Sequence, residues 1–349
     1  MRFYAIIFFL LVLLSGCAPK APSLLAEWST GNLRDVAWSP DSSMFVINYW
    51  RDNDDSNSYV QAFNVKSLAS MWIANHSLAS DITFTSDGQF TVESNQFAPF
   101  FYWRNIKSGK VVRQGEFTDV SQIKDGDCSG GGEIIVNSLH KNIALIANYL
   151  DLMGPSWRTH HTVVIRQLDL ETGRCKNLFD YQGTFDLFDL DSSGTILAYG
   201  GEGKDDAVIL WNVEKQESIC RIPQVEFGRF VPSQNILSVV REKTIVFIDT
   251  SDCKEIRALN VAPKSDYKNY LAFSPDGKQF AIAQDSIESR DTITGEIQAQ
   301  IPFPKNAVPD SSKLLFNGMK FSPDGSYLLV AYYPLGSIYK SQIQLWQLK

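Results

Sequence analysis

The stretch Asn269–Ala283, NYLAFSPDGKQFAIA, decides the fold of this chain. Apolar and polar residues alternate on both sides of Ser274-Pro275-Asp276-Gly277, which is the pattern of two β-strands joined by a tight turn. Proline presets the backbone angle that such a turn needs, and glycine supplies the positive φ that a Cβ resists. The stretch therefore predicts a β-hairpin.

The same pattern recurs along the chain, which predicts a repeat architecture. Close copies lie at 36–47 and 319–330, and looser copies at 82–92, 187–198 and 227–239. Each unit is expected to hold four strands, and the third strand often ends in an aromatic residue followed by a polar one. These third-strand ends are Phe63-Asn64, Trp103-Arg104, Leu168-Asp169, Trp211-Asn212, Ile248-Asp249 and Trp346-Gln347.

The last unit, 316–349, stops at its third strand, 341–348. The segment Leu24–Thr30, LLAEWST, has the pattern of a strand and has no unit of its own. A ring of sheets must close or leave a long strand edge exposed. We therefore expect an all-β ring of seven four-stranded blades, closed by residues 24–30 as the outer strand of the last blade. Unit three, 133–181, is irregular and leaves six or eight blades as alternatives.

Seven units with this closure resemble the WD40 family of β-propellers over residues 24–349. The SPDG turns and the Trp-bearing third strands match that family. No unit carries the family's Trp-Asp pair, and Asn75-His76 is the nearest approach to its Gly-His pair. The resemblance implies a diverged, WD40-like propeller.

The N-terminus is typical of an export signal. Met1-Arg2 is a short basic start, and Phe3–Leu14 is an apolar run too short for a membrane span of about 20 residues. Leu14-Ser15-Gly16-Cys17 then resembles the lipobox of bacterial lipoproteins. The alternative is an ordinary secretory signal followed by an incidental cysteine.

The lipobox resemblance implies a signal peptide over 1–16 and a diacylglycerol on Cys17, usually with an N-acyl chain such as palmitate. Two or more chains anchor a protein stably. Residues 17–23 are expected to form a Pro-rich, lipidated tether, followed by the propeller over 24–349. By analogy with sorting in Gram-negative bacteria, Ala18 favours the outer membrane, with the propeller facing the periplasm.

Composition excludes some partners. The chain has 349 residues, a formal net charge of −7 and 44% hydrophobic residues, so it can bury a full core. Nucleic-acid binding requires a basic face, and the sequence has no run of Lys or Arg that would provide one. We expect no nucleic-acid partner.

The longest connections all fall on one face of the expected ring. They are 51–58, 118–132, 151–160, 303–315 and 334–340, whereas every connection on the other face is short. Long loops on a rigid scaffold are where binding residues concentrate. Trp50, Trp157, Tyr333 and Tyr339 lie in or beside these loops and are candidate partner-binding residues. The alternative is that they pack the loops onto the ring.

The sequence holds no recognisable catalytic or metal-binding set. His160 and His161 are adjacent, so in an extended segment they point to opposite sides. The acidic loop 51–58 lacks the glycine and terminal glutamate of a calcium loop, and Gly-rich 127–132 lacks the lysine of a phosphate-binding loop. We expect no metal and no cofactor.

Cys128, Cys175, Cys220 and Cys253 remain after Cys17. An even number in an exported protein permits two disulfides in three possible pairings. We favour a disulfide between Cys220 and Cys253 and leave the other pair open. Buried free thiols are the alternative.

Together these features favour a lipid-anchored propeller of the cell envelope that binds a protein partner and is not an enzyme. One alternative is a sensor of a small ligand or glycan with an aromatic-lined pocket. The other is a hydrolase or lyase with its site at the central channel, which would place His, Asp, Glu or Arg at the channel mouth.

Overall fold

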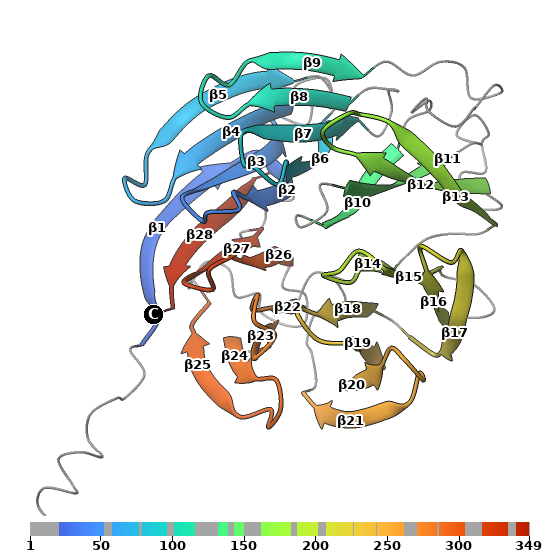
Figure 1. Ribbon diagram of the computed structural model, residues 1–349. Coiled ribbons are helices and arrows are strands. Elements are labelled where there is room, and N and C mark those ends of the chain that lie inside the picture. Colours follow the sequence, from blue (N-terminus) through green and yellow to red (C-terminus); the bar gives the residue numbers. More distant parts are fainter. Residues whose placement is uncertain are drawn as a thin grey trace, which may run out of the picture.

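Seven four-stranded antiparallel sheets form the fold and surround a central axis as the blades of a β-propeller (Figure 1). The structure is a computed structural model that describes residues 21–51, 58–76, 79–95, 101–115, 132–138, 143–149, 162–182, 187–201, 207–225, 227–241, 243–261, 271–284, 286–303, 316–333 and 340–348. These ranges contain strands and turns but no helix, and thus no helix able to cross a membrane. The all-β class and the seven blades are as predicted.

The first three blades share one order, in which sequential strands run from the channel to the rim. Blade one holds β2 (Asn32–Trp38), β3 (Met44–Trp50), β4 (Ser58–Asn64) and β5 (Ser70–His76); blade two holds β6 (Ala79–Phe84), β7 (Phe90–Asn95), β8 (Phe101–Asn105) and β9 (Val111–Gly115); blade three holds β10 (Gly132–Ser138), β11 (Ile143–Tyr149), β12 (Thr162–Asp169) and β13 (Cys175–Gln182).

Blades four to six repeat this order. Blade four holds β14 (Leu187–Leu190), β15 (Ile196–Gly201), β16 (Ala207–Asn212) and β17 (Glu217–Pro223); blade five holds β18 (Phe227–Val231), β19 (Ile236–Arg241), β20 (Thr244–Asp249) and β21 (Glu255–Asn260); blade six holds β22 (Leu271–Phe273), β23 (Gln279–Ala283), β24 (Ile287–Asp291) and β25 (Ile297–Ile301).

Blade seven joins the two ends of the described chain. Its sheet runs β26 (Phe316–Phe321), β27 (Tyr327–Tyr332), β28 (Ser341–Gln347) and then β1 (Ser23–Thr30). β1 is antiparallel to β28 and pairs Trp28 with Ile343 and Thr30 with Ser341. The ring is therefore closed by the N-terminal strand, as the sequence predicts for residues 24–30.

Alternate side chains of the second strands fill the spaces on both sides of a blade. In β3, Phe45 and Ile47 pack with Leu329 and Ile343 of blade seven. Val46 points the other way and belongs to the cluster that contains Ile82 of blade two. Since both faces are buried, such strands read as nearly continuous apolar runs.

Polar side chains at the ends of the third strands accept hydrogen bonds from the turns that lead to the outer strands. The Asn105 Oδ1 atom accepts the backbone N–H groups of Lys107 and Ser108, each at 3.1 Å. Asn64, Asp169, Asn212, Asp249 and Asp291 accept turn N–H groups in the same way. Short polar side chains favour such turns because they replace a backbone acceptor. In blade two the residue that caps the turn is Asn105, which follows the pair Trp103-Arg104.

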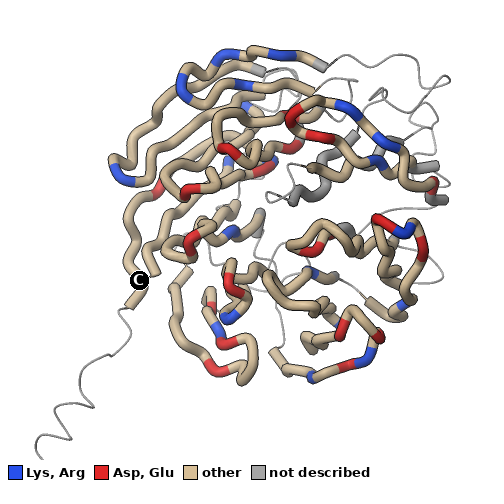
Figure 2. Tube along the Cα trace, in the orientation of Figure 1, with Lys and Arg blue, Asp and Glu red and all other residues tan. Residues whose placement is uncertain are grey.

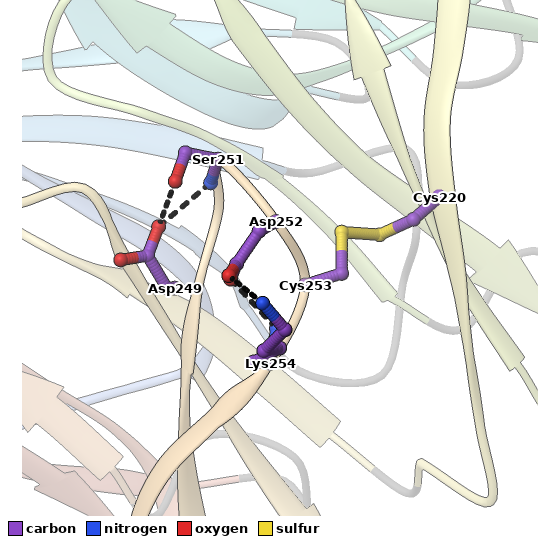
Figure 3. Close-up of a disulfide and its surroundings, with 6 residues drawn as sticks. All are labelled: Cys220, Asp249, Ser251, Asp252, Cys253 and Lys254. Carbon is purple, nitrogen blue, oxygen red and sulfur yellow. Dashed lines mark hydrogen bonds and ion pairs between the residues drawn. A yellow bond between two sulfur atoms is a disulfide. The ribbon is translucent and has the colours of Figure 1, made fainter.

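A disulfide joins Cys220 of β17 to Cys253, which lies in the turn between β20 and β21 (Figure 3). The two Cα atoms are 6.5 Å apart. Because Cys253 lies in a turn and not on the outer strand, blade five can reach the outer strand of blade four. Cys175 is disulfide-bonded as well, whereas Cys128 lies outside the described residues.

Replacing Cys220 and Cys253 together by serine is expected to lower the unfolding free energy by about 3 kcal/mol. The bond closes a loop with a sequence separation of 33 residues, and its loss gives back chain entropy to the unfolded state. Urea denaturation of the oxidised protein and of the double variant measures the difference. An unchanged urea midpoint would contradict this prediction.

Candidate functional site

The two faces of the ring differ in their connections. We call the face with the turns between first and second strands, and between third and fourth strands, the short-turn face. The opposite, long-loop face holds the connections between β3 and β4 (51–57), β9 and β10 (116–131), β11 and β12 (150–161), β25 and β26 (302–315), and β27 and β28 (333–340). Apart from a few end residues, these long connections lie outside the described residues.

On the short-turn face, the polar side chains of the turns form hydrogen bonds within their own turn. In blade one the Ser39 Oγ atom donates to Asp41 Oδ1 at 2.7 Å, and the same oxygen accepts the Ser43 N–H at 3.0 Å. Thr85 and Asp87, Ser274 and Asp276, and Ser322 and Asp324 repeat this arrangement. The hydrogen bond from Ser39 is the main cause of the lowered pKa of the Asp41 carboxyl. These polar groups are thus used within the turns.

Two candidate aromatic residues, Trp50 and Tyr333, are linked through Asn32 on the long-loop face, where blades seven and one adjoin. The Tyr333 hydroxyl donates to Asn32 Oδ1 at 2.6 Å, and Asn32 is the strand partner of Trp50. The exposed Arg34 places its guanidinium carbon 3.9 Å from the Trp50 ring centroid. We name Asn32, Arg34, Trp50 and Tyr333 the blade-junction cluster. Trp157 and Tyr339, the other candidates, lie outside the described residues.

Close backbone packing holds this cluster in place. A Cβ on Gly31 would lie 1.8 Å from the carbonyl oxygen of Trp50, so only glycine fits there. The Gly31 carbonyl accepts the Ser341 N–H at 3.1 Å, and the Ser341 hydroxyl accepts the Leu33 N–H at 3.0 Å. The blade-junction cluster therefore sits on a rigid connection between blades seven and one.

The first strands of the blades surround a central cavity of about 580 Å³. Charges of both signs line it and come from β2, β6, β14, β18 and β26; they are Arg34, Asp35, Asp81, Asp189, Arg229 and Lys320. The size is that of a pocket for a small ligand, which occupies about 300–1,000 Å³.

Asp35 links three blades at the channel. Its Oδ1 atom lies 2.7 Å from Lys320 Nζ of blade seven, and its Oδ2 atom accepts the Ile82 N–H of blade two at 3.1 Å. It also accepts the N–H of Val36 at 2.7 Å. The carboxylate is therefore held by one cation and two backbone groups.

Asp189 plays a similar part between blades four and five. It accepts the Phe230 N–H at 2.7 Å and the Leu190 N–H at 3.0 Å. Burial raises the pKa of the Asp189 carboxyl, and the nearby positive charge of Arg229 offsets part of that rise. A buried acid with a raised pKa is typical of functional sites but also of structural contacts. Here the hydrogen bonds join neighbouring blades.

Sequence reasoning missed these channel charges, although the repeat contains a signal for them. Ala37, Thr83, Asp189, Arg229, Ala272 and Lys320 each lie two positions before the residue that starts the first turn of their blade. These six residues, from blades one, two, four, five, six and seven, all line the central cavity. Aligning the repeats by their turns, and then reading this position, would have identified Asp189, Arg229 and Lys320.

In the part of the chain that the structure describes, no group of three or more His, Cys, Asp or Glu side chains is placed to hold a metal ion. His160 and His161 lie outside that part. No protein-family model and no curated protein matches this chain. The described site thus offers a charged channel and an aromatic and cationic cluster on the long-loop face.

Proposed function

We propose that this chain is a lipid-anchored, non-enzymatic platform of the bacterial cell envelope that binds a partner protein on its long-loop face. The asymmetry between the two faces carries the proposal. Described turns on the short-turn face satisfy their own polar groups, whereas every long connection opens on the other face. A rigid ring with variable loops on one side is suited to recognition.

The blade-junction cluster supports a protein partner. Arginine and tryptophan are the residue types most often found among the strongest contacts of protein interfaces. Arg34 is exposed and already stacked on Trp50, so binding through it costs little ordering of side chains. We therefore propose that Arg34 contacts the partner directly and that Trp50 and Tyr333 position it.

The channel acids favour a structural role over a catalytic one. A general acid or base must reach the proton of its substrate. Asp35 and Asp189 instead direct their oxygens to backbone N–H groups of the next blade. This use of the acids supports a ring built for rigidity, in line with a platform that carries out no reaction.

The N-terminal sequence supports the anchor, because a lipidated Cys17 would precede β1 by only a short tether. The Ser/Thr-x-Asp turns, repeated in four blades, support kinship with WD40-like propellers in a diverged form. We propose the outer membrane as the site of attachment, with the ring in the periplasm.

A small charged ligand in the channel is the second candidate function. The cavity has the volume of a ligand pocket, and its lining carries both acids and bases. Such a ligand would bind independently of the long loops, so its binding should survive their shortening, but it would contact Arg34, which lines the cavity.

Crosslinking in intact membranes, followed by capture of the chain, tests the platform. Substituting Arg34→Glu is expected to reduce capture of one defined partner about tenfold, which corresponds to about 1.4 kcal/mol of binding free energy. Shortening 118–131 and 151–160 is expected to abolish capture. Lys278→Glu, an exposed change on the short-turn face, is the matched control and should leave capture unchanged.

Capture that persists at full strength in the Arg34→Glu and loop-shortened variants would show that the long-loop face is not the binding face. If no partner is captured by the unaltered chain, the platform proposal is wrong. Titration calorimetry with small charged ligands would then test the channel.

A further inference from the structure

Charge is distributed unevenly over the rim of the ring. The outer two strands of blades one and two, with their turns, span 58–76 and 101–115. These ranges contain no Asp or Glu and five cations, which are Lys66, Arg104, Lys107, Lys110 and Arg113. The corresponding strands of blades five and six are rich in acids, namely Asp249, Asp252, Glu255, Glu288, Asp291 and Glu296. Figure 2 shows this contrast around the ring. We call 58–76 and 101–115 the basic rim.

Three of the five cations are available to a partner. Arg104 is buried and paired with Glu93, and Arg113 donates to the carbonyl oxygen of Glu171 in blade three. Lys66, Lys107 and Lys110 are exposed and form no ion pair with any described residue. In a chain with a net charge of −7, an uncompensated positive patch requires a reason.

Large exposed apolar side chains lie on β5 and β9, the strands that follow these lysines. Ile73 of β5 is 54% exposed and Val112 of β9 is 57% exposed, and Met71 and Val111 are exposed beside them. Apolar side chains interspersed with lysines are typical of surfaces that rest in the headgroup region of a bilayer. Protein interfaces, in contrast, are depleted in lysine.

The position of the N-terminal strand brings the basic rim toward the anchor. β1 begins at Ser23, and its Trp28 ring packs 5.0 Å from Phe63 and 5.5 Å from Phe45 of blade one, measured between ring centroids. The chain therefore enters the ring in blade seven, and its first strand packs against the adjacent blade one. Residues 17–22 span at most about 20 Å even when fully extended. A lipid on Cys17 would hold this part of the rim close to the bilayer.

We propose that the basic rim binds the anionic surface of the bilayer, so that the ring stands on the rim of blades one and two. This inference rests on the proposed anchor, which fixes the rim near the membrane. Each lysine near an anionic surface strengthens binding by about fivefold, so three together contribute about a hundredfold. The tether keeps the local lipid concentration high, and weak contacts then suffice. This orientation leaves the long-loop face accessible to a protein partner.

The test uses the full chain, purified from membranes and reconstituted into vesicles. A water-soluble amine reagent labels exposed lysines, and mass spectrometry measures the labelling rate at each position. In vesicles with phosphatidylglycerol, we expect labelling of Lys66, Lys107 and Lys110 to fall at least fivefold relative to phosphatidylcholine vesicles. Labelling of Lys215, Lys243 and Lys278, exposed lysines of blades four, five and six, should stay unchanged.

Charge-reversal variants provide the second measurement. This measurement uses residues 21–349, which retain the complete described ring and are added to vesicles from outside. The affinity of K66E/K107E/K110E for phosphatidylglycerol vesicles is expected to be at least tenfold lower than that of the unaltered chain. K215E/K243E/K278E carries the same change in net charge and should bind like the unaltered chain.

Equal labelling of both lysine sets in the two kinds of vesicle would overturn the proposal. Protection of the rim lysines in native membranes but not in lipid vesicles would overturn it too, because it would assign the rim to a protein partner. Release of the full chain from membranes by salt would disprove the proposed anchor. The binding of residues 21–349 to vesicles would then show, independently of the anchor, whether the basic rim binds anionic lipid.

Discussion

A chain that starts at Asn32, and so lacks β1, is expected to lose its cooperative unfolding transition and to aggregate. β1 supplies the outer strand of blade seven and pairs along the length of β28. Its removal leaves the edge of β28 without a partner and exposes apolar side chains that pack against it. We expect this to be the largest effect of any change discussed, because it opens the ring.

The contacts of Trp28 explain why this strand matters beyond its backbone hydrogen bonds. Its ring packs against Phe45 and Phe63 of blade one, so β1 connects blade seven to blade one as well as to β28. Size-exclusion chromatography and urea denaturation measure the outcome. A chain that starts at Ala21 is the control and should unfold cooperatively. A monomeric, cooperatively folded chain from Asn32 would show that closure is dispensable.

Substituting Arg104→Ala is expected to lower the unfolding free energy by about 3–5 kcal/mol. Arg104 Nε lies 2.6 Å from Glu93 Oε1, and the two side chains are 4% and 0% exposed. Arg104 also donates to the Gly109 carbonyl oxygen at 2.8 Å. Removing Arg104 leaves the buried Glu93 carboxylate without its cation, which is far more costly than the pair itself is stabilising.

Blade six provides a matched comparison. Arg290 donates to the Gly295 carbonyl at 2.8 Å, as Arg104 does to that of Gly109. Its acid partner Glu288 comes from the same strand, β24, and not from a neighbouring strand, and the pair is more exposed, at 18% and 10%. Arg290→Ala should therefore cost less than Arg104→Ala when both are measured by urea denaturation. The double variant Glu93→Leu/Arg104→Leu should recover part of the stability that Arg104→Ala loses. Equal losses of unfolding free energy in Arg104→Ala and Arg290→Ala would contradict the expectation that the more buried ion pair is the more costly one to break.

The repeat made the architecture predictable from sequence. The Ser/Thr-x-Asp turns and the alternating strands beside them are local signals, since a period of two and a turn residue depend only on near neighbours. The lone strand 24–30 could be assigned to blade seven because the last unit lacked a fourth strand, and the structure places it there as β1.

The candidate site was less predictable because it depends on contacts between blades. Arg34 could be placed on Trp50, and Lys320 beside Asp35, only once the distances between strands were known. Two of the four candidate aromatics, Trp157 and Tyr339, lie outside the described residues.

Closure by β1 and β28, the first and last of the described strands, also has a consequence for folding. Trp28 pairs with Ile343, so the first of the described strands must wait for the last of them before it can pair. Contacts so far apart in sequence form slowly, because a long loop must close before they are gained. We therefore expect the closure of blade seven to be a late event of folding. Until β28 has been synthesised, β1 remains an unpaired apolar strand that has to be kept from associating with other chains.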